Sequence, residues 1–366
     1  MRRVIFLHNK FPKNKPELLS LLSRWNQYGE AVQRYSGDDG IWLFTLSFQK
    51  DKLSPTKYIK FFDSVEVHPK FLVRIWALTR EIRQSSANFT LVCGDTQNSL
   101  LIGIYLRLLF RSKVQIQTQF HGDIYSFRFN RGLKGTLRAC LSRIGIINSY
   151  SIRIVSKFQM SEITSFAPES KHKFVLAPIP IDYSRIATPR KSKTTDLTFI
   201  GRLHQERGIV ELIKLIELIK KVLPETKVVI AGDGPLRTLI QEELSQWIEK
   251  GDLKLLGFLN SEQILDVYAD TKILISTAPR EGYGLTLREA ALSQVLVVAR
   301  SSKGACEAKD SYPLQIKTFS TLDEAVSLIQ TSLNQKFDFA IARQIDTQIE
   351  LDSQGVTRLV HSWFDN

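Results

Sequence analysis

Two carboxylates and two glycines fall within one short segment of the chain, residues 279–290. Glu281 and Glu289 lie eight positions apart, and Gly282 and Gly284 lie between them. Glycine lets the backbone turn sharply and come close to a ligand, because it has no Cβ atom. Both carboxylates could therefore face one ligand and hold its hydroxyl groups.

The same segment predicts a helix start that suits a phosphate group. Tyr283 stands between the two glycines, and Leu285–Leu292 follows as a predicted helix. The amides of Leu285 and Thr286 would lie at the positive end of this helix, where anions bind. Alternatively, Thr286 and Glu289 form a capping box, which satisfies the first helical amides and binds no ligand. Both interpretations fit this segment taken by itself.

A second loop adds positive charge. Arg202 and Arg207 lie five positions apart, directly after the predicted strand Leu197–Ile200. Two guanidinium groups on one loop can clamp a diphosphate with paired hydrogen bonds, and they can supply the charge that a metal ion would otherwise give. A third loop, at residues 232–236, joins two glycines to a proline that suits the first turn of a helix.

These loops follow strands in an alternating series that fills the second half of the chain. The predicted strands are Leu197–Ile200, Lys227–Ala231, Leu253–Leu256, Ile273–Ser276 and Val295–Ala299. The helices predicted between them are Ile209–Val222, Leu236–Glu249, Ser261–Tyr268 and Leu285–Leu292. Strands separated by helices predict a parallel, doubly wound sheet.

The first half alternates in the same way and predicts a second doubly wound sheet. Its predicted strands are Val4–Leu7, Ile41–Leu46, Phe89–Cys93, Val114–Thr118 and Ile152–Val155. His121 comes just after one of them, and ligands bind beyond the carboxyl ends of strands in open α/β sheets. His121 is therefore a candidate catalytic residue, or else a structural hydrogen-bonding group.

Composition limits the class of protein. The chain has 366 residues, of which 43% are hydrophobic and 24% charged, so we expect a globular protein with room for two domains. The three cysteines form no Cys-x-x-Cys pair, which is typical of buried thiols in a reducing compartment. The N-terminus predicts a strand and no signal peptide, and the most apolar helix, Leu100–Phe110, is too short to span a bilayer.

Charge is distributed unevenly along the chain. Residues 1–185 contain 28 Lys/Arg against 13 Asp/Glu, whereas residues 186–366 contain 22 against 24. A basic domain on an otherwise neutral chain indicates a polyanionic partner, either nucleic acid or anionic lipid headgroups, or else an ordinary solvated surface. The sequence has no recognition-helix motif, so we expect no nucleic-acid partner.

As a set, these motifs resemble the retaining, nucleotide-sugar-dependent glycosyltransferases of family 4. The resemblance covers roughly residues 196–308 and rests on Gly201-Arg202-Leu203, Gly232-Asp233-Gly234-Pro235-Leu236, Gly257-Phe258-Leu259 and the segment from Glu281 to Glu289. It implies GT-B architecture, an α/β fold in which two doubly wound Rossmann-like domains face each other across a cleft. The sequence departs from the family at residue 207, where Arg207 replaces the usual lysine, and at residues 9–12, where the usual Gly-rich turn is absent.

The resemblance also implies roles for individual residues. Arg202 and Arg207 would bind the donor diphosphate, Glu289 the ribose hydroxyls and Glu281 the sugar hydroxyls. His121 would lie across the cleft, near the donor sugar and the acceptor. The turn that caps the phosphate would comprise Gly282, Tyr283, Gly284, Leu285 and Thr286. Members of this kind usually work without a divalent metal, so we expect no cofactor and no metal ligands.

We therefore expect an enzyme that moves a sugar from an NDP-sugar, with UDP or GDP as the nucleotide, to a lipid-linked or polysaccharide-precursor acceptor, with retention. The expected domains are 1–183 on the acceptor side, completed by a terminal helix at 353–366, a linker at 184–195, and 196–352 on the donor side. The basic first domain would hold the protein peripherally on an anionic membrane surface in the cytoplasm. Two alternatives stay open: a catalytically inactive scaffold subunit, and an NDP-sugar epimerase or hydrolase.

Overall fold

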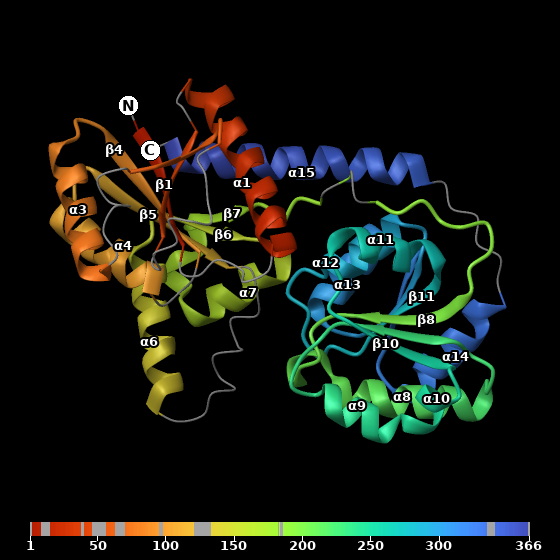
Figure 1. Ribbon diagram of the computed structural model, residues 1–366. Helices are drawn as coiled ribbons and strands as arrows, with labels where there is room; N and C mark the ends of the chain where they lie inside the picture. Colours follow the sequence, from red (N-terminus) through yellow and green to blue (C-terminus); the bar gives the residue numbers. More distant parts are fainter. Residues whose placement is uncertain are drawn as a thin grey trace. The chain divides into compact units, whose positions relative to one another are not determined.

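The computed structural model divides the chain into two compact units, each built around one parallel sheet (Figure 1). The residues that it describes are 2–8, 15–37, 40–45, 56–62, 70–94, 98–120, 133–181, 183, 186–334 and 341–364. Unit 1 comprises Met1–Pro180 with Leu351–Asn366, and unit 2 comprises Ile181–Glu350. The α/β class and the two doubly wound parallel sheets predicted from the sequence are confirmed.

Unit 1 contains a parallel sheet with the strand order β3-β2-β1-β4-β5-β6-β7. The strands are β1 (Arg2–His8), β2 (Ile41–Thr45), β3 (Ile59–Phe61), β4 (Asn88–Cys93), β5 (Val114–Phe120), β6 (Ser151–Ile154) and β7 (Phe174–Leu176). The helices are α1 (Lys15–Ser36), α3 (Phe71–Gln84), α4 (Asn98–Leu109), α6 (Leu133–Asn148), α7 (Lys157–Phe166) and the 3₁₀ helix η1 (Pro168–Lys173).

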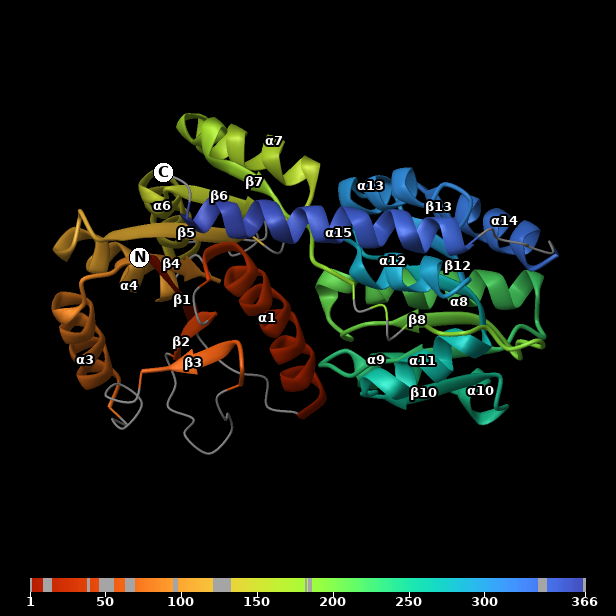
Figure 2. The same ribbon diagram turned by 90° about the horizontal axis from the view of Figure 1, so that it is seen from above.

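Alternation along the central strand β1 sends side chains to two separate cores. Ile5 and Leu7 pack on one face, in the core that includes α3 and α4. Val4 and Phe6 pack on the other face, in the core that includes α1. Helices therefore cover both faces of the sheet (Figure 2), as the buried parallel strands of unit 1 require.

Unit 2 contains a second parallel sheet with the order β10-β9-β8-β11-β12-β13. The strands are β8 (Thr195–Ile200), β9 (Val228–Ala231), β10 (Leu253–Gly257), β11 (Thr271–Ser276), β12 (Leu296–Arg300) and β13 (Ile316–Phe319). The helices are η3 (Gln205–Arg207), α8 (Ile209–Val222), α9 (Arg237–Glu243), α10 (Ser245–Glu249), α11 (Ser261–Asp270), α12 (Leu285–Leu292), α13 (Lys303–Ser311), α14 (Leu322–Leu333) and α15 (Ile341–Phe364), whose second part belongs to unit 1.

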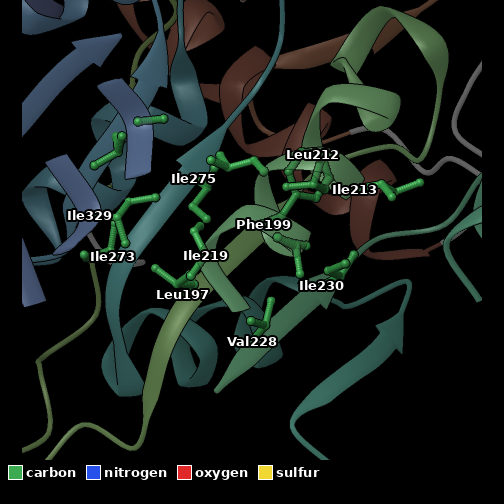
Figure 3. Packing of buried hydrophobic residues seen from close by; sticks show 14 of the residues in the cluster. Leu197, Phe199, Leu212, Ile213, Ile219, Val228, Ile230, Ile273, Ile275 and Ile329 are labelled. Atoms are coloured by element: carbon green, nitrogen blue, oxygen red, sulfur yellow. The ribbon is translucent and has the colours of Figure 1, made fainter. Parts of the chain in front are cut away.

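The larger core of unit 2 lies between its sheet and helices α8 and α14. Figure 3 shows Phe199 of β8 among the side chains of α8 and β9, including Ile213 and Ile230. Burying one such side chain contributes about 2 kcal/mol. On the opposite face, Leu274 and Val297 join a second core with α11, α12 and α13. Both faces of β8 and β11 are therefore fixed by packing, which holds the loops that follow them.

The terminal helix α15 is longer than the sequence predicted, and its last turns belong to unit 1. Leu359, Val360 and Trp363 are buried there with Phe6 of β1. The Trp363 indole donates to Gln117 Oε1 at 2.6 Å, and its carbonyl accepts from the hydroxyl of Thr90 at 2.6 Å. The indole edge also meets the Phe6 ring, with centroids 5.5 Å apart. Through these contacts the apolar face of the last turns of α15 packs against the sheet of unit 1.

Two local predictions differ from the structure. The segment predicted as one helix over Leu236–Glu249 is two helices, α9 and α10, separated at Leu244. The polar segment 184–195 was expected to be a linker, but its described residues belong to unit 2. Lys193 donates to Gln294 O at 2.8 Å there, and burial lowers the Lys193 pKa to about 8. Hydrogen bonds to a helix–strand junction therefore fix a segment whose composition alone resembles a linker.

Candidate functional site

The candidate site of unit 2 lies where its chain order reverses across the sheet. Strand β8 pairs with β9 on one side and with β11 on the other. The loops after β8 and β11 therefore emerge side by side, at the carboxyl edge where open α/β sheets bind ligands. The first loop holds both candidate arginines, and the second holds Glu281. Sequence order separates these loops by about seventy residues, and the sheet brings them together.

The loop after β8 rests directly on the backbone of the loop after β9. A Cβ atom on Gly232 would lie 1.8 Å from Gly201 O, and one on Gly234 would lie 2.5 Å from Leu203 O. Leu203 N donates to Asp233 O at 2.9 Å, and its carbonyl accepts from the amide of Leu236 at 3.0 Å. Only glycine permits this approach, so the Gly-x-Gly pattern at 232–234 shapes the arginine loop.

A second close approach joins the arginine loop to the loop after β11. Gly208 has a left-handed backbone, with φ of 68°, and a Cβ atom there would lie 2.1 Å from Thr277 O. The buried Thr277 hydroxyl donates to Gly208 O at 2.9 Å and to Arg207 O at 3.2 Å. The backbone that carries Arg207 is thereby fixed against the strand end that leads to Glu281.

Arg207 and Glu281 form an ion pair across the two loops. Arg207 Nη1 lies 2.8 Å from Glu281 Oε2. The arginine side chain is 29% exposed and the glutamate side chain 15%, so both atoms can reach a ligand at the surface without being freely solvated. Partial burial makes such a pair stronger than one in open water. The pair brings together two predicted site residues from different motifs.

Arg202 has a different setting on the same loop. Its side chain is 73% exposed and pairs with Glu206 one turn further along the chain. His204 lies between them and accepts a hydrogen bond from the Glu206 amide through Nδ1. An exposed guanidinium can reorient toward an anion, because screening by water makes its present pair weak.

Helix α12 begins directly after Gly284, which has a left-handed φ of 72° and occupies the N-cap position. No side chain caps this helix start, so the capping box of Thr286 and Glu289 is absent. Thr286 lies instead within the first helical turn. Leu285 and Thr286 are both partly exposed. Their amides belong to the group of helix-start donors that have no acceptor within a helix, which suits an anion.

The turn before α12 is braced from behind by two residues. The buried guanidinium of Arg288 lies over the Tyr283 ring, 4.4 Å from its centroid, and donates to Tyr283 O at 3.2 Å. A Cβ atom on Gly304 of α13 would lie 2.1 Å from Glu281 O. Tyr283 thus points into the protein, where it supports the turn. Gly282 belongs to the same partly exposed turn and offers only backbone groups to a ligand.

Glu289 lies one turn further along α12, beside the buried hydroxyl of Tyr268. Burial raises the Tyr268 pKa well above its ordinary value, and the charge of Glu289 and a hydrogen bond to its carboxylate raise it further. The Tyr268 hydroxyl also lies 3.3 Å from Thr286 O. Tyr268 therefore keeps its proton and holds the half-buried Glu289 carboxylate in place.

His121, the remaining candidate, lies outside the described residues. The strand before it, β5, extends to Phe120 instead of ending at Thr118. Close to this strand end, Arg153 is buried and donates to Tyr28 Oη at 2.8 Å and to Ala177 O at 3.0 Å. This buried arginine gave no signal in the sequence.

The sequence also failed to identify Thr277, Tyr268 and Arg288 as parts of the site. Thr277 had a usable signal, since it directly follows a predicted strand. Tyr268 and Arg288 reach the site only through packing between helices, so no local pattern marks them. Within the described part of the chain, no three His, Cys, Asp or Glu side chains gather as metal ligands, and no helix is long and apolar enough to cross a membrane.

Comparison with known proteins identifies the domain that carries these loops. Residues 181–313 match the family model of glycosyl transferases group 1. The uncharacterized glycosyltransferase YqgM of Bacillus subtilis is 24% identical over 204 residues, which are 54% of this chain and 55% of YqgM. The phosphatidylinositol N-acetylglucosaminyltransferase gpi3 subunit of Schizosaccharomyces pombe is 29% identical over 126 residues, 34% of this chain and 28% of that subunit. The matches span about half or less of the length of these relatives.

Solved structures match over nearly the whole chain. The lipopolysaccharide outer core galactosyltransferase WaaB has a TM-score of 0.67 at 14% identity and covers 99% of both chains. WaaG, a glycosyltransferase of lipopolysaccharide biosynthesis, has a TM-score of 0.67 at 11% identity and covers 99% of this chain and 100% of its own. HepE of Anabaena, in complex with UDP-glucose, has a TM-score of 0.63 at 13% identity and covers 99% and 95%. Residues 181–313 of unit 2 are therefore similar to glycosyl transferases group 1, in a chain that has the fold of GT-B glycosyltransferases.

Proposed function

We propose that this protein is a retaining glycosyltransferase that moves a sugar from an NDP-sugar to a lipid-linked or polysaccharide-precursor acceptor. The observation that carries the proposal is the Arg207–Glu281 pair at the switch point of unit 2. A cation for the diphosphate and a carboxylate for sugar hydroxyls stand 2.8 Å apart, beside a helix start that suits phosphate.

In the transfer step, the bond between the anomeric carbon and the diphosphate breaks, and a bond to the acceptor oxygen forms on the same face of the sugar. The acceptor hydroxyl gives its proton to an oxygen of the departing diphosphate. Negative charge grows on the departing diphosphate. Arg202, Arg207 and the amides at the start of α12 would stabilise this charge, which is the largest contribution that such a site can make. Because two guanidinium groups and a helix terminus supply the positive charge, we propose that transfer needs no divalent metal.

Glu281 acquires a second role from its present contact. In the structure, its carboxylate neutralises Arg207. A bound diphosphate would compete for this guanidinium, and the freed carboxylate would turn to the sugar hydroxyls. In this proposal, one ion pair couples the binding of the donor's nucleotide to the binding of its sugar.

Glu289 would accept hydrogen bonds from the ribose hydroxyls. Its carboxylate is held by the protonated Tyr268, so the acceptor atoms are oriented before a ligand arrives. His121 remains the proposed catalytic residue near the donor sugar and acceptor.

The donor and the acceptor are proposed partly from similar proteins. HepE is known with UDP and with UDP-glucose, which favours UDP over GDP as the nucleotide. The gpi3 subunit bears the name of a phosphatidylinositol N-acetylglucosaminyltransferase, and WaaB and WaaG belong to lipopolysaccharide biosynthesis. We propose by this likeness that the acceptor is lipid-linked. The protein would then work in the cytoplasm, peripherally attached to an anionic membrane.

The test is calorimetric titration with UDP, GDP, ADP and dTDP, each with and without EDTA. We expect saturable binding of one nucleotide, unaffected by EDTA and weakened at least about tenfold in Arg207→Ala, because charged hydrogen bonds to the diphosphate are lost. Arg202→Ala should weaken it less, since Arg202 is more exposed. No binding of any nucleotide by the folded protein would contradict the proposal and favour an inactive scaffold subunit.

A second assay separates transfer from reactions without an acceptor. The protein is incubated with a nucleotide sugar that contains the nucleotide found to bind. The incubation is done first without and then with a membrane lipid extract. Sugar incorporation that requires the extract supports transfer. Release or isomerisation of the sugar in its absence would instead identify a hydrolase or an epimerase.

A further inference from the structure

Helices α4 and α6 of unit 1 are apolar on their outer faces as well as their inner ones. Leu108 of α4 is 60% exposed, and Leu137 of α6 is 61% exposed. The exposed apolar side chains on these two helices are Leu101, Tyr105, Leu108, Leu109, Leu137, Ile144 and Ile147. The outer face of a helix on a soluble protein is usually polar. We call this set the α4–α6 surface.

Helical spacing places three of the exposed side chains of α4 on one side of that helix. Leu101, Tyr105 and Leu108 lie at i, i+4 and i+7 on α4, and so share one side of that helix. The opposite side of α4 is buried in the core of unit 1 through Leu100 and Leu106. The exposed leucines are therefore not needed to attach α4 to its sheet.

The two stripes lie on helices that pack against each other. A Cβ atom on Gly145 of α6 would lie 1.9 Å from Leu100 Cδ2 of α4, so glycine allows close packing of the helices. Arg107 of α4 also donates to the carbonyl of Asn148 at the end of α6. The seven side chains consequently belong to neighbouring elements of one face of the sheet.

Helix α3 packs on the same face of the sheet and also exposes apolar side chains. Its buried side, Leu78 and Ile82, belongs to the same core as α4. Its outer side exposes Leu72 at 76% and Trp76 at 61%. Tryptophan is the residue type that most favours the boundary between lipid and water, because its ring is apolar and its N–H can be hydrated.

The charge of this region is one-sided. Residues 96–161 contain ten Lys/Arg and one acidic residue, Asp123. Arg111 follows the end of α4 and is exposed. Arg143 of α6 is also exposed and pairs with Glu169 at 3.2 Å, a surface contact that water keeps weak. Lys113 lies near the end of α3, where it donates to Ser85 O at 2.8 Å. The apolar side chains of the α4–α6 surface are thus set in a strongly basic stretch of chain.

We propose that the α4–α6 surface, with Leu72 and Trp76 of α3, docks unit 1 onto an anionic lipid bilayer. The apolar side chains would enter the acyl boundary while the arginines and lysines contact the headgroups. A second copy of the chain is disfavoured as the occupant, because two basic faces would repel each other. This inference rests on the proposed function, since it gives an enzyme with a lipid-linked acceptor its position on the membrane.

The test is sedimentation of the full chain with vesicles of phosphatidylcholine alone and of phosphatidylcholine with phosphatidylglycerol in a two-to-one ratio. We expect binding to the anionic vesicles that falls as salt is raised, and little binding to the neutral ones. The triple substitution Leu101→Ser, Leu108→Ser and Leu137→Ser should reduce the partition coefficient at least about tenfold. Arg83 is exposed in the last turn of α3. The substitutions Arg83→Gln and Arg111→Gln should each reduce the partition coefficient about fivefold at low salt.

A matched control uses exposed apolar residues of unit 2. Val210, Val222 and Leu314 are similarly exposed, and serine at all three should leave vesicle binding unchanged. None of the six substituted residues belongs to a hydrophobic core. Both triple variants should therefore keep the unfolding midpoint of the wild type. Equal loss of binding in the two triple variants would overturn the proposal.

Two further outcomes would also overturn it. One is failure of the folded wild type to bind anionic vesicles. The other is self-association in sedimentation velocity that the Leu101, Leu108 and Leu137 variant abolishes, because a second copy would then occupy the surface. Nucleotide titration of the same variants separates the two proposals. UDP binding without vesicle binding defeats only the docking surface, whereas vesicle binding without nucleotide binding defeats only the proposed enzyme.

Discussion

Units 1 and 2 use the same way of winding a chain but differ in what they place on it. In each sheet the chain first runs outward on one side of the opening strand and then reverses to the other side, at β1/β4 in unit 1 and at β8/β11 in unit 2. In unit 2, glycines bring three loops into backbone contact at that edge. In unit 1, the distinctive side chains lie on the outer faces of helices. The topology is therefore a common frame, and loops or helix surfaces decide the chemistry.

Charge follows the same division. Unit 1 contains 28 Lys/Arg against 14 Asp/Glu, whereas unit 2 contains 22 against 23. The basic residues of unit 2 are mostly balanced, and its Arg207 has a specific partner. The excess of unit 1 has no such balance within its own sequence. We infer that unit 2 binds charge at one point, while unit 1 offers charge over a wide surface.

The largest expected effect comes from removing the charge of Glu281 while keeping its shape. Glu281→Gln should lower sugar transfer by about 10² to 10³. Nucleotide binding should stay equal or become tighter, because Arg207 loses its competing partner. Turnover and calorimetric affinity for UDP are measured on the same protein.

The control for this variant is Glu206→Gln, which removes the exposed partner of Arg202. It should change turnover by less than about threefold, because an exposed ion pair contributes little. Turnover near the wild-type level in Glu281→Gln would remove Glu281 from the mechanism.

Alanine substitutions at two glycines test how much the close backbone contacts in the loops of unit 2 contribute to stability. Gly208 in unit 2 and Gly37 in unit 1 have nearly the same φ, 68° and 66°. A Cβ atom meets Thr277 O at 2.1 Å in the first case and nothing within 4 Å in the second. Gly37→Ala should cost about 1 kcal/mol of unfolding free energy, from the left-handed backbone alone. Gly208→Ala should cost about 3 kcal/mol, since the overlap adds to it.

Chemical denaturation and UDP titration check this pair. Only Gly208→Ala should weaken nucleotide binding, because the displaced backbone carries Arg207. Equal losses of stability in the two variants would mean that the loop contact adds nothing to the strained φ.

A pair of buried arginines compares the two sheet edges directly. Arg153 in unit 1 lies over the Tyr28 ring, 5.2 Å from its centroid, as Arg288 in unit 2 lies over the Tyr283 ring. Methionine at either position should cost about 2–3 kcal/mol, because hydrogen bonds to buried carbonyls are lost. Only Arg288→Met should weaken UDP binding, since Arg288 braces the turn before α12. The opposite pattern would place nucleotide recognition in unit 1.

The last prediction concerns stability alone, at the edge of unit 2 away from the site. Asp252 is buried just before β10, with the ammonium groups of Lys227, Lys250 and Lys220 at 2.6, 3.2 and 3.3 Å. A hydrogen bond from Lys227 is the largest influence that holds the Asp252 pKa far below its usual range. The ionised Asp252 carboxylate therefore contributes its full stabilisation above a pH of about 4, and this stabilisation is lost as the pH falls below that value.

Thermal unfolding at different pH values tests this cluster. Asp252→Asn should lower the unfolding midpoint at neutral pH, and its midpoint should fall less steeply than that of the wild type below a pH of about 4. Parallel curves for the two proteins would show that the carboxylate is not responsible for the acid sensitivity.

Local patterns predicted much of the fold. Helix α8 has the predicted bounds, Ile209–Val222, because its apolar residues recur at helical spacing and Gly208 precedes it. Helix α12 also has its predicted bounds, since Gly284 marks its start. The predicted end of β5 was Thr118, two residues before the observed Phe120, and the predicted start of α15 was residue 353, twelve residues after the observed Ile341. Burial and packing extend an element beyond the pattern that begins it.

The candidate site was predictable in its parts but not in its assembly. The glycine and arginine motifs predicted Arg207 and Glu281 as candidates, because turn chemistry is local, and the structure places the two side chains in contact. The support given by Tyr268 and Arg288 was not predictable, since each acts from a helix whose own sequence is satisfied by ordinary packing.

The sequence by itself determined the alternation of strands and helices, the positions of the glycine turns and the excess of basic residues in the first half. Each of these depends on neighbours along the chain or on composition alone. Only the tertiary structure decided that Arg207 pairs with Glu281, that residues 186–195 belong to unit 2, and that the leucines of α4 and α6 face outward. These facts depend on which strands lie side by side and which helix faces are covered, and no local pattern specifies either.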